Sequence, residues 1–267
     1  MEQTSALGSF VRRNRGLVVV VLLLIALLIF GSFYSDRFRT TSNILNVFEQ
    51  STGLALVSLG QTLTILTGGI DMSVGSMISL LSLLTSGLID GKANLVVPVA
   101  AGILVLGALI GAINGLGIVW LKVHPLIVTL GMGALLQGIA LLYSLGPAGK
   151  VPPNFKFLAY GKVLGLPIAA VFAILLFIAV ALFLRYVRLG RYIYAVGDDH
   201  TGARLMGLPR SRVIIFVYTM SGICCALTSI YLVSRFGVGQ PYTGINYTLA
   251  SITPVVVGGT LLAGGRG

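Results

Sequence analysis

Eight apolar stretches, each about as long as a bilayer is thick, dominate this sequence of 267 residues. A helix needs about 20 apolar residues to cross the hydrocarbon core of a bilayer. The stretches lie at residues 17–34, 44–67, 70–89, 95–120, 126–144, 166–184, 213–234 and 247–263. Because helices satisfy their own backbone hydrogen bonds in lipid, this pattern predicts an all-α polytopic membrane protein with about eight transmembrane or re-entrant helices.

The composition excludes a soluble protein. Hydrophobic residues make up 56% of the chain and charged residues only 9%, whereas globular proteins contain about 25% charged residues. The net charge of +11 comes from basic residues between the apolar stretches and not from a basic face with interleaved aromatics, so nucleic acid is not an expected partner. We expect a cytoplasmic N-terminus at 1–16 and one membrane domain over 17–267.

Basic residues also predict the orientation of the chain. Arg12, Arg13 and Arg15 precede the first stretch, and six arginines lie in the polar connection at 185–212. Arginine and lysine accumulate on the cytoplasmic side of membranes, so both segments are expected there. Six stretches separate the two segments, and this even number agrees with the charge count. A hairpin and a re-entrant turn between the second and third stretches give the same parity, so both remain open.

A glycine pair interrupts the apolar sequence between these two stretches. Gly68 and Gly69 end one stretch, and the string from Asp71 to Gly75 opens the next. Non-helical backbone at membrane depth is tolerated only where protein or a cavity surrounds it, so a broken helix is predicted, as in many transporters. The glycine spacing recurs from Gly258 to Gly265. Because no helix follows this second copy, we expect the C-terminus to be incomplete.

The interior is expected to combine a glycine stripe with a few polar side chains. The stripe consists of Gly107, Gly111 and Gly115, whose spacing lets a neighbouring helix approach closely. Polar residues at membrane depth must face protein or water and are candidates for a substrate pathway. The candidates are Gln61, Asp71, Asn114 and Gln137, with Glu49 and Gln50 nearer the end of their stretch.

Two interpretations of Asp71 are open. A carboxylate in a membrane interior is costly and is commonly functional, which favours contact with a substrate or an ion. An aspartate that follows two glycines and precedes an apolar stretch is also well placed to cap the next helix, accepting from amides two or three residues later. The residues alone favour the cap.

No catalytic or metal-binding motif is present in the sequence. The string from Gly146 to Lys150 is the nearest approach to a phosphate-binding loop, but its spacing is wrong and no hydroxyl residue follows the lysine. The chain contains only His124 and His200, and its two cysteines, Cys224 and Cys225, are adjacent in an apolar stretch. We therefore expect no catalytic residue, no metal and no cofactor bound by this chain.

The polar connection at 185–212 is the remaining informative segment. It is long enough for a short cytoplasmic helix, with acidic residues near the start and an arginine near the end, as the helix dipole favours. A solvated loop whose arginines only set the topology is the alternative. The residues of interest are Asp198, Asp199, Thr201, Gly202, Ala203, Arg204, Gly207 and Pro209.

In these motifs the sequence resembles the permease subunits of bacterial ABC importers for ribose, xylose, galactosides and similar small sugars. The resemblance runs through residues 66–76, 113–115, 125–131, 190–209 and 258–267. It implies that residues 198–209 form the coupling loop that docks on an ATPase. Thr201 and Gly202 stand where the importer pattern E-A-A-x-x-x-G has Glu and its first Ala, whereas Ala203 and Gly207 match.

The resemblance also implies the partners and the place of the chain. It implies a second permease subunit, two ATPases that bind ATP and magnesium, an extracytoplasmic sugar-binding protein, and the lipid of a bacterial inner membrane. Full-length relatives have room for about two further helices of about 20 residues, about ten in all. A branched-chain amino-acid permease, or an ion-coupled secondary transporter that uses Asp71 and Glu49, is the alternative.

Overall fold

The computed structural model describes residues 15–267, and side chains from residue 18 onward. Arg12 and Arg13, which were expected to orient the N-terminus, lie outside the described residues. The chain divides into two compact units, residues up to Val47 and Phe48–Gly267, and each is described by itself. The prediction of one membrane domain over 17–267 stays a prediction.

The first unit contains the helix α2 (Arg15–Tyr34), the short helix η1 (Asp36–Arg39) and the first residues of α3, up to Val47, whereas most of α3 belongs to the second unit. Every α2 side chain from Val19 to Phe30 is exposed, which suits a helix surrounded by lipid. Gly31 provides room for the ring of Phe38, which lies 3.0 Å from where a Cβ atom would be.

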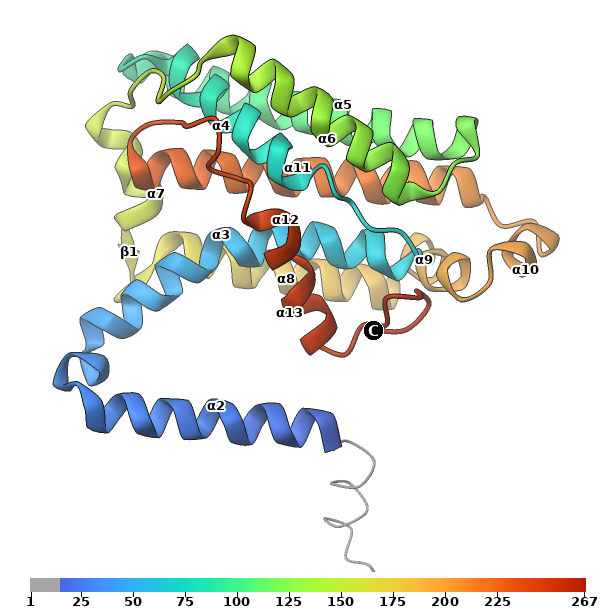
Figure 1. The fold of residues 1–267 in the computed structure, drawn as a ribbon, viewed down its shortest axis with the longest axis horizontal. Coiled ribbons are helices and arrows are strands. Elements are labelled where there is room, and N and C mark those ends of the chain that lie inside the picture. Colours follow the sequence, from blue (N-terminus) through green and yellow to red (C-terminus); the bar gives the residue numbers. More distant parts are fainter. Residues whose placement is uncertain (1–14) are drawn as a thin grey trace, which may run out of the picture. The chain divides into compact units, whose positions relative to one another are not determined.

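In the second unit the remaining apolar stretches all form helices, so the predicted all-α polytopic fold is confirmed (Figure 1). The helices are α3 (Thr41–Leu66), α4 (Val74–Ile89), η2 (Ala93–Leu95), α5 (Val96–Leu121), α6 (Pro125–Tyr143), η3 (Pro153–Lys156), α7 (Phe157–Tyr160), α8 (Ile168–Tyr186), α9 (Arg188–Asp198), α10 (His200–Leu205), α11 (Arg210–Phe236), α12 (Tyr247–Ala250) and α13 (Ile252–Val257). A hairpin of β1 (Lys162–Val163) and β2 (Leu166–Pro167), paired antiparallel, was not anticipated.

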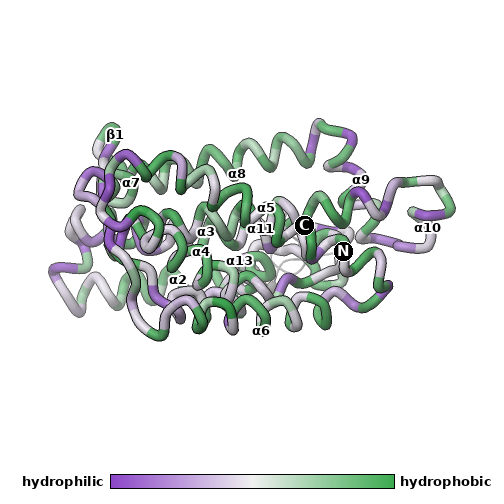
Figure 2. Tube along the Cα trace, turned by 90° about the horizontal axis from the view of Figure 1, so that it is seen from above, coloured by the Kyte–Doolittle hydropathy of each residue, from purple (hydrophilic) through white to green (hydrophobic). Residues whose placement is uncertain are grey.

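Four of the described helices are long and apolar enough to cross a bilayer, namely Ala93–Leu121, α6, α8 and α11. Helix α4 is apolar but shorter, and α3 carries more polar residues because much of it, from Thr52 onward, is buried among other helices. Within the second unit, hydrophilic segments gather at the α9–α10 end and at the opposite end near α7 and β1 (Figure 2). The apolar band between these two ends is the part expected to lie in the bilayer.

Helix α11 is the central helix of the second unit. Two thirds of its most apolar window (67%) is buried, against 22% for α6 and 17% for α8. It packs antiparallel on the glycine stripe of α5: a Cβ atom added at Gly107 would lie 2.5 Å from the carbonyl oxygen of Gly222, and one at Gly115 would lie 2.6 Å from the Cα atom of Ile215. Gly111, between them, meets the α11 backbone in the same way. The stripe therefore brings two backbones into direct contact.

Candidate functional site

The break between α3 and α4 lies at the glycine pair. Helix α3 ends at Leu66 and α4 begins at Val74, and Gly68 adopts a left-handed conformation with φ +77°. The 16 residues of α4 extend about 24 Å, whereas the 26 residues of α3 extend about 39 Å. Non-helical backbone therefore replaces part of a span, and its polar groups need partners inside the protein.

Asp71 is fully buried and forms hydrogen bonds with its own segment and with α11. Its Oδ1 atom accepts hydrogen bonds from the backbone N–H of Ser73 at 3.0 Å and from the Ser73 hydroxyl at 2.6 Å. Its Oδ2 atom accepts from the hydroxyl of Ser221, on α11, at 2.9 Å. The carboxylate is thus occupied by three donors. The bond to the N–H two residues later is an Asx turn that precedes α4, whose N-cap is Ser73, so Asp71 does not itself cap that helix as predicted.

Two of the predicted pathway residues join Asp71 in this cluster. The side-chain amide of Gln61 on α3, oriented with its oxygen toward the N–H of Asp71 and its nitrogen toward the Asp71 carbonyl, makes both contacts at 3.3 Å. Asn114 on α5 donates from Nδ2 to the Ser73 hydroxyl at 2.9 Å. Both residues are fully buried.

A threonine from α6 completes the cluster. Thr129 accepts from the N–H of Met72 at 3.0 Å and donates to the carbonyl of Ile70 at 3.2 Å. Helices α3, α5, α6 and α11 thus each contribute one polar side chain to the break. We call this set the break network, and it comprises Gln61, Asp71, Ser73, Asn114, Thr129 and Ser221. The sequence analysis missed Thr129 and Ser221, because a small hydroxyl residue in an apolar helix commonly bonds only its own helix.

Gln137 lies apart from the break network. Its Nε2 atom donates to the carbonyl of Pro241 at 2.9 Å, and its Oε1 atom is buried without a hydrogen-bond partner among the described residues. Glu49 is also separate: it is half-buried, and its carbonyl accepts from the hydroxyl of Tyr231.

The polar connection forms two helices, α9 and α10. Asp199 caps α10, because its Oδ1 atom accepts from the N–H of Thr201 at 2.8 Å. Hydrogen bonds from the backbone N–H groups of Gly202 and Thr201 lower the pKa of Asp199. Asp198 closes α9 and is exposed.

Gly207 closes α10 and reverses the chain. It adopts φ +71°, its N–H donates to the carbonyl of Arg204 at 3.0 Å, and the N–H of Leu208 donates to the carbonyl of Ala203 at 3.0 Å. These two bonds form a Schellman motif, which places glycine in the left-handed position. The A-x-x-x-G spacing therefore has a local structural reason, and Pro209 follows as the N-cap of α11.

The two faces of the α9–α10 segment differ in their packing. Ala203 is fully buried in an apolar cluster that includes Ile193 and Val213. By contrast, Leu205 is 83% and Met206 is 69% exposed. The sequence analysis did not single out these two residues, although apolar side chains inside a polar connection were the signal available.

The α9–α10 segment touches the break through glycine backbone. A Cβ atom added at Gly197 would overlap the carbonyl oxygen of Leu66, the last residue of α3, and would lie 2.6 Å from the backbone nitrogen of Gly265. The N–H of Gly265 donates to the same Leu66 carbonyl at 3.0 Å. The ends of α3 and α9 and the C-terminal turn therefore meet without intervening side chains, and the two similar glycine strings of the sequence lie together.

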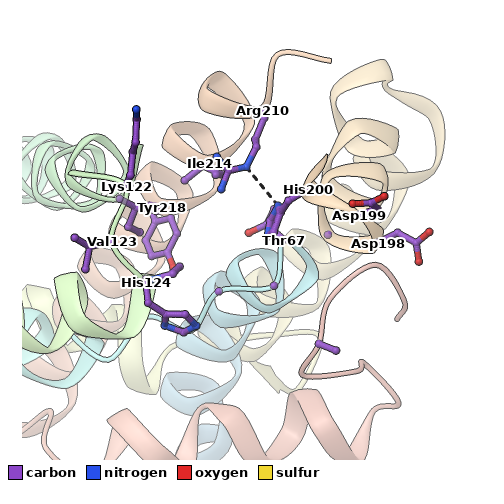
Figure 3. A pocket seen from close by; sticks show the side chains of 16 residues that line it. Thr67, Lys122, Val123, His124, Asp198, Asp199, His200, Arg210, Ile214 and Tyr218 are labelled. Atoms are coloured by element: carbon purple, nitrogen blue, oxygen red, sulfur yellow. Dashed lines mark hydrogen bonds between the residues drawn. The ribbon is translucent and has the colours of Figure 1, made fainter. Parts of the chain in front are cut away.

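A cavity of about 670 Å³ opens at this place (Figure 3). It lies between Thr67 after α3, His124 in the α5–α6 turn, His200 and the start of α11. The Nε atom of Arg210 donates to Nδ1 of His200 at 3.4 Å. Burial and then the charge of Arg210 lower the pKa of His200, against an opposing effect of Asp199.

Comparisons with known proteins agree with this architecture. Residues 43–265 match a family described as branched-chain amino acid transport system / permease component. The chain is 37% identical over 259 residues to the ribose import permease protein RbsC of Escherichia coli strain K12, covering 94% of this chain and 78% of that protein. It is 34% identical over 250 residues to the D-allose transport system permease protein AlsC of the same strain, covering 92% and 76%. It is 34% identical over 276 residues to the fructose import permease protein FrcC of Rhizobium meliloti, covering 98% and 75%. None of the solved structures matches this chain.

The fold and the anchored break define a multi-pass helical membrane protein. The chain belongs to the matched family of ABC-transporter permeases. The ATPase of such a transporter is a separate subunit, so this chain is not an enzyme.

Proposed function

We propose that this chain forms the path of a small, ribose-like sugar through the bacterial inner membrane in an ATP-driven importer. The observation that carries the proposal is the similarity to permeases named for ribose, D-allose and fructose, which extends over more than nine tenths of this chain. The branched-chain amino-acid description of the family is the reason to keep a second candidate substrate.

The chemistry of the interior supports a neutral substrate. Asp71 is the only charged residue among the fully buried described residues, and three donors occupy its carboxylate. A neutral sugar requires hydrogen-bonding groups without net charge, whereas the zwitterion of an amino acid requires charged or helix-end partners. Gln137 and Asn114 are the pathway candidates that each keep one buried acceptor, Oε1 and Oδ1 respectively, without a hydrogen-bond partner among the described residues. Gln61, whose amide oxygen and nitrogen are both engaged, would contribute only if the break network opened.

The α10 helix is proposed to dock the ATPase. The exposed Leu205, which is the last residue of α10, and Met206, which is its C-cap, offer an apolar contact beside an otherwise polar segment. Movement of α10 would then reach the break through Gly197 and Leu66, whose backbones are in contact. This arrangement requires the α9–α10 end and the N-terminus to face the cytoplasm, with a binding protein on the opposite side and a second permease subunit beside the chain.

Uptake by the reconstituted transporter tests the substrate. The full chain would be placed in liposomes with its cognate permease partner, ATPases and binding protein, and labelled ribose and leucine would be compared. We expect ATP-dependent uptake of ribose that persists when an ionophore dissipates ion gradients. Uptake of leucine in place of ribose would establish the amino-acid alternative, and uptake abolished by the ionophore would contradict an ATP-driven mechanism.

A further inference from the structure

Two histidines face the cavity at the α9–α10 end as hydrogen-bond donors. Nδ1 of His124 accepts from the N–H of Leu126 at 3.3 Å, and Nδ1 of His200 accepts from Arg210 at 3.4 Å. A neutral imidazole that accepts at Nδ1 carries its proton at Nε2. Within the described residues 15–267, the hydrogen bonds of the two rings involve only Nδ1, and neither Nε2 atom donates to another residue. Both rings therefore have a free N–H in the wall of the cavity.

Arg210 and Tyr218, both on α11, add two further donors to the same cavity. Among the described residues the only ion pair joins Arg39 and Asp36, so no carboxylate neutralises the Arg210 guanidinium. The Tyr218 side chain is 1% exposed, and its hydroxyl is buried with no hydrogen-bond partner in the described part of the chain. An unsatisfied buried hydroxyl is costly, so this group indicates a missing partner.

The two acidic residues at the rim of the cavity, Asp198 and Asp199, are not partners of Arg210 or Tyr218. The formal charges of the lining residues cancel, because Lys122 and Arg210 are balanced by Asp198 and Asp199. However, Figure 3 shows both carboxylates on the far side of His200, directed away from Arg210. The Asp199 carboxylate is already engaged in capping α10. Figure 3 also shows the Lys122 side chain directed away from His124 and His200, so the side chains that face the cavity carry donors in excess and the one positive charge of Arg210.

We propose that this cavity binds a phosphate group, as inorganic phosphate or as the phosphate of a small monoester. Donors reach the cavity from the α5–α6 turn, from α10 and from α11, and a tetrahedral oxyanion presents acceptor oxygens in several directions at once. The volume of about 670 Å³ is large enough for a phosphorylated monosaccharide.

The position of the site gives it a consequence for transport. A phosphate bound to His124, His200 and Arg210 would connect the α5–α6 turn to the α9–α10 segment and to α11. These elements must move relative to one another if α10 transmits the action of the ATPase. If the proposed function holds, the reaction that supplies the ligand is phosphorylation of the imported sugar, and its product would slow further import.

Binding to the purified full chain tests the site without any transport. The chain in a detergent free of anionic lipid would be titrated with sodium phosphate by calorimetry, at an ionic strength held constant with sodium chloride. We expect saturable binding that Arg210→Gln weakens at least tenfold. The neighbouring Arg212→Gln, which changes an exposed arginine outside the cavity, should leave the dissociation constant within twofold.

Tyr218→Phe provides a second variant in case Arg210→Gln does not fold. It removes one buried hydroxyl and should weaken phosphate binding several-fold without lowering stability, because the hydroxyl has no partner among the described residues. Absence of saturable binding to the unmodified chain, or equal losses in Arg210→Gln and Arg212→Gln, would overturn the proposal.

Two further titrations distinguish the source of the phosphate. Ribose 5-phosphate that binds at least tenfold more tightly than inorganic phosphate, with free ribose inactive, would identify a phosphorylated sugar. Binding that appears only with phosphatidic acid would identify a lipid headgroup. If inorganic phosphate and ribose 5-phosphate both bind but sugar uptake fails in the reconstituted transporter, the result would support the phosphate site and contradict the proposed sugar substrate.

Discussion

The α3–α4 break and the α9–α10 segment both connect long helices, α3 to α4 and α8 to α11. They differ in which side chains are buried and which are exposed. At the break, polar groups are inside: Asp71 and its partners on α3, α5, α6 and α11 have no exposed surface or very little. In the α9–α10 segment, apolar groups are outside, with Leu205 and Met206 mostly exposed. Polar residues are usually exposed and large apolar residues are usually buried in proteins, so both regions show the reverse of the usual arrangement.

This difference indicates two different tasks. Buried polar side chains at the break satisfy backbone groups that lipid would leave unpaired, so they hold the non-helical chain in one conformation. Exposed apolar side chains at the α9–α10 end gain nothing within the chain and are available to a partner. We therefore interpret the break as a fixed anchor and propose that the α9–α10 segment is a contact surface.

Replacing Asp71 should produce the largest effect. Asp71→Leu removes the acceptor of three donors, and each unsatisfied buried donor costs about 1–3 kcal/mol. The sum approaches the whole stability of a typical domain, about 5–15 kcal/mol. We expect little monodisperse protein in size-exclusion chromatography, whereas Asp198→Leu at an exposed position should give a normal yield. A normal yield of Asp71→Leu would show that the anchor lies elsewhere.

Changes on the two faces of α10 should separate folding from docking. Ala203→Glu places a charge in a buried apolar cluster and should destabilise the chain by several kcal/mol. The double variant Leu205→Ser with Met206→Ser alters only exposed groups, so its thermal unfolding should match that of the unmodified chain. Its recovery of copurifying ATPase should fall at least tenfold, equivalent to about 1.4 kcal/mol. Undiminished recovery would rule out this surface as the docking site.

The smallest effect is expected at Gly207. A Cβ atom there would meet no atom within 4 Å, so Gly207→Ala tests only the strain of φ +71°. The free energy of unfolding should fall by about 1–2 kcal/mol. Gly138→Ala is the matched control, because that glycine also has open space but lies within α6, where alanine is the better helix former. Equal free energies of unfolding for the two variants would show that the left-handed conformation of Gly207 in the Schellman motif does not require glycine.

The spans, the position of the break and the place of α10 were all predictable, because each depends on residues close together in the sequence. Asp71 and Ser73 are two residues apart, so the local bond between them could be expected from that spacing, although Ser73 and not Asp71 is the N-cap of α4. Gln137 was grouped with Gln61 by residue type alone, yet it bonds Pro241 and takes no part in the break network.

Hydropathy is a local property, so the eight apolar stretches by themselves determined that this chain is a polytopic helical membrane protein. Which polar side chains meet at the break was decided only when the helices packed, because Asn114 lies 41 residues from Ser73 and Ser221 lies 150 residues from Asp71. The exposure of Leu205 and the donor-rich cavity beside His200 arose in the same way. Contacts over such separations depend on the registers and rotations of several helices at once, and no single segment encodes them.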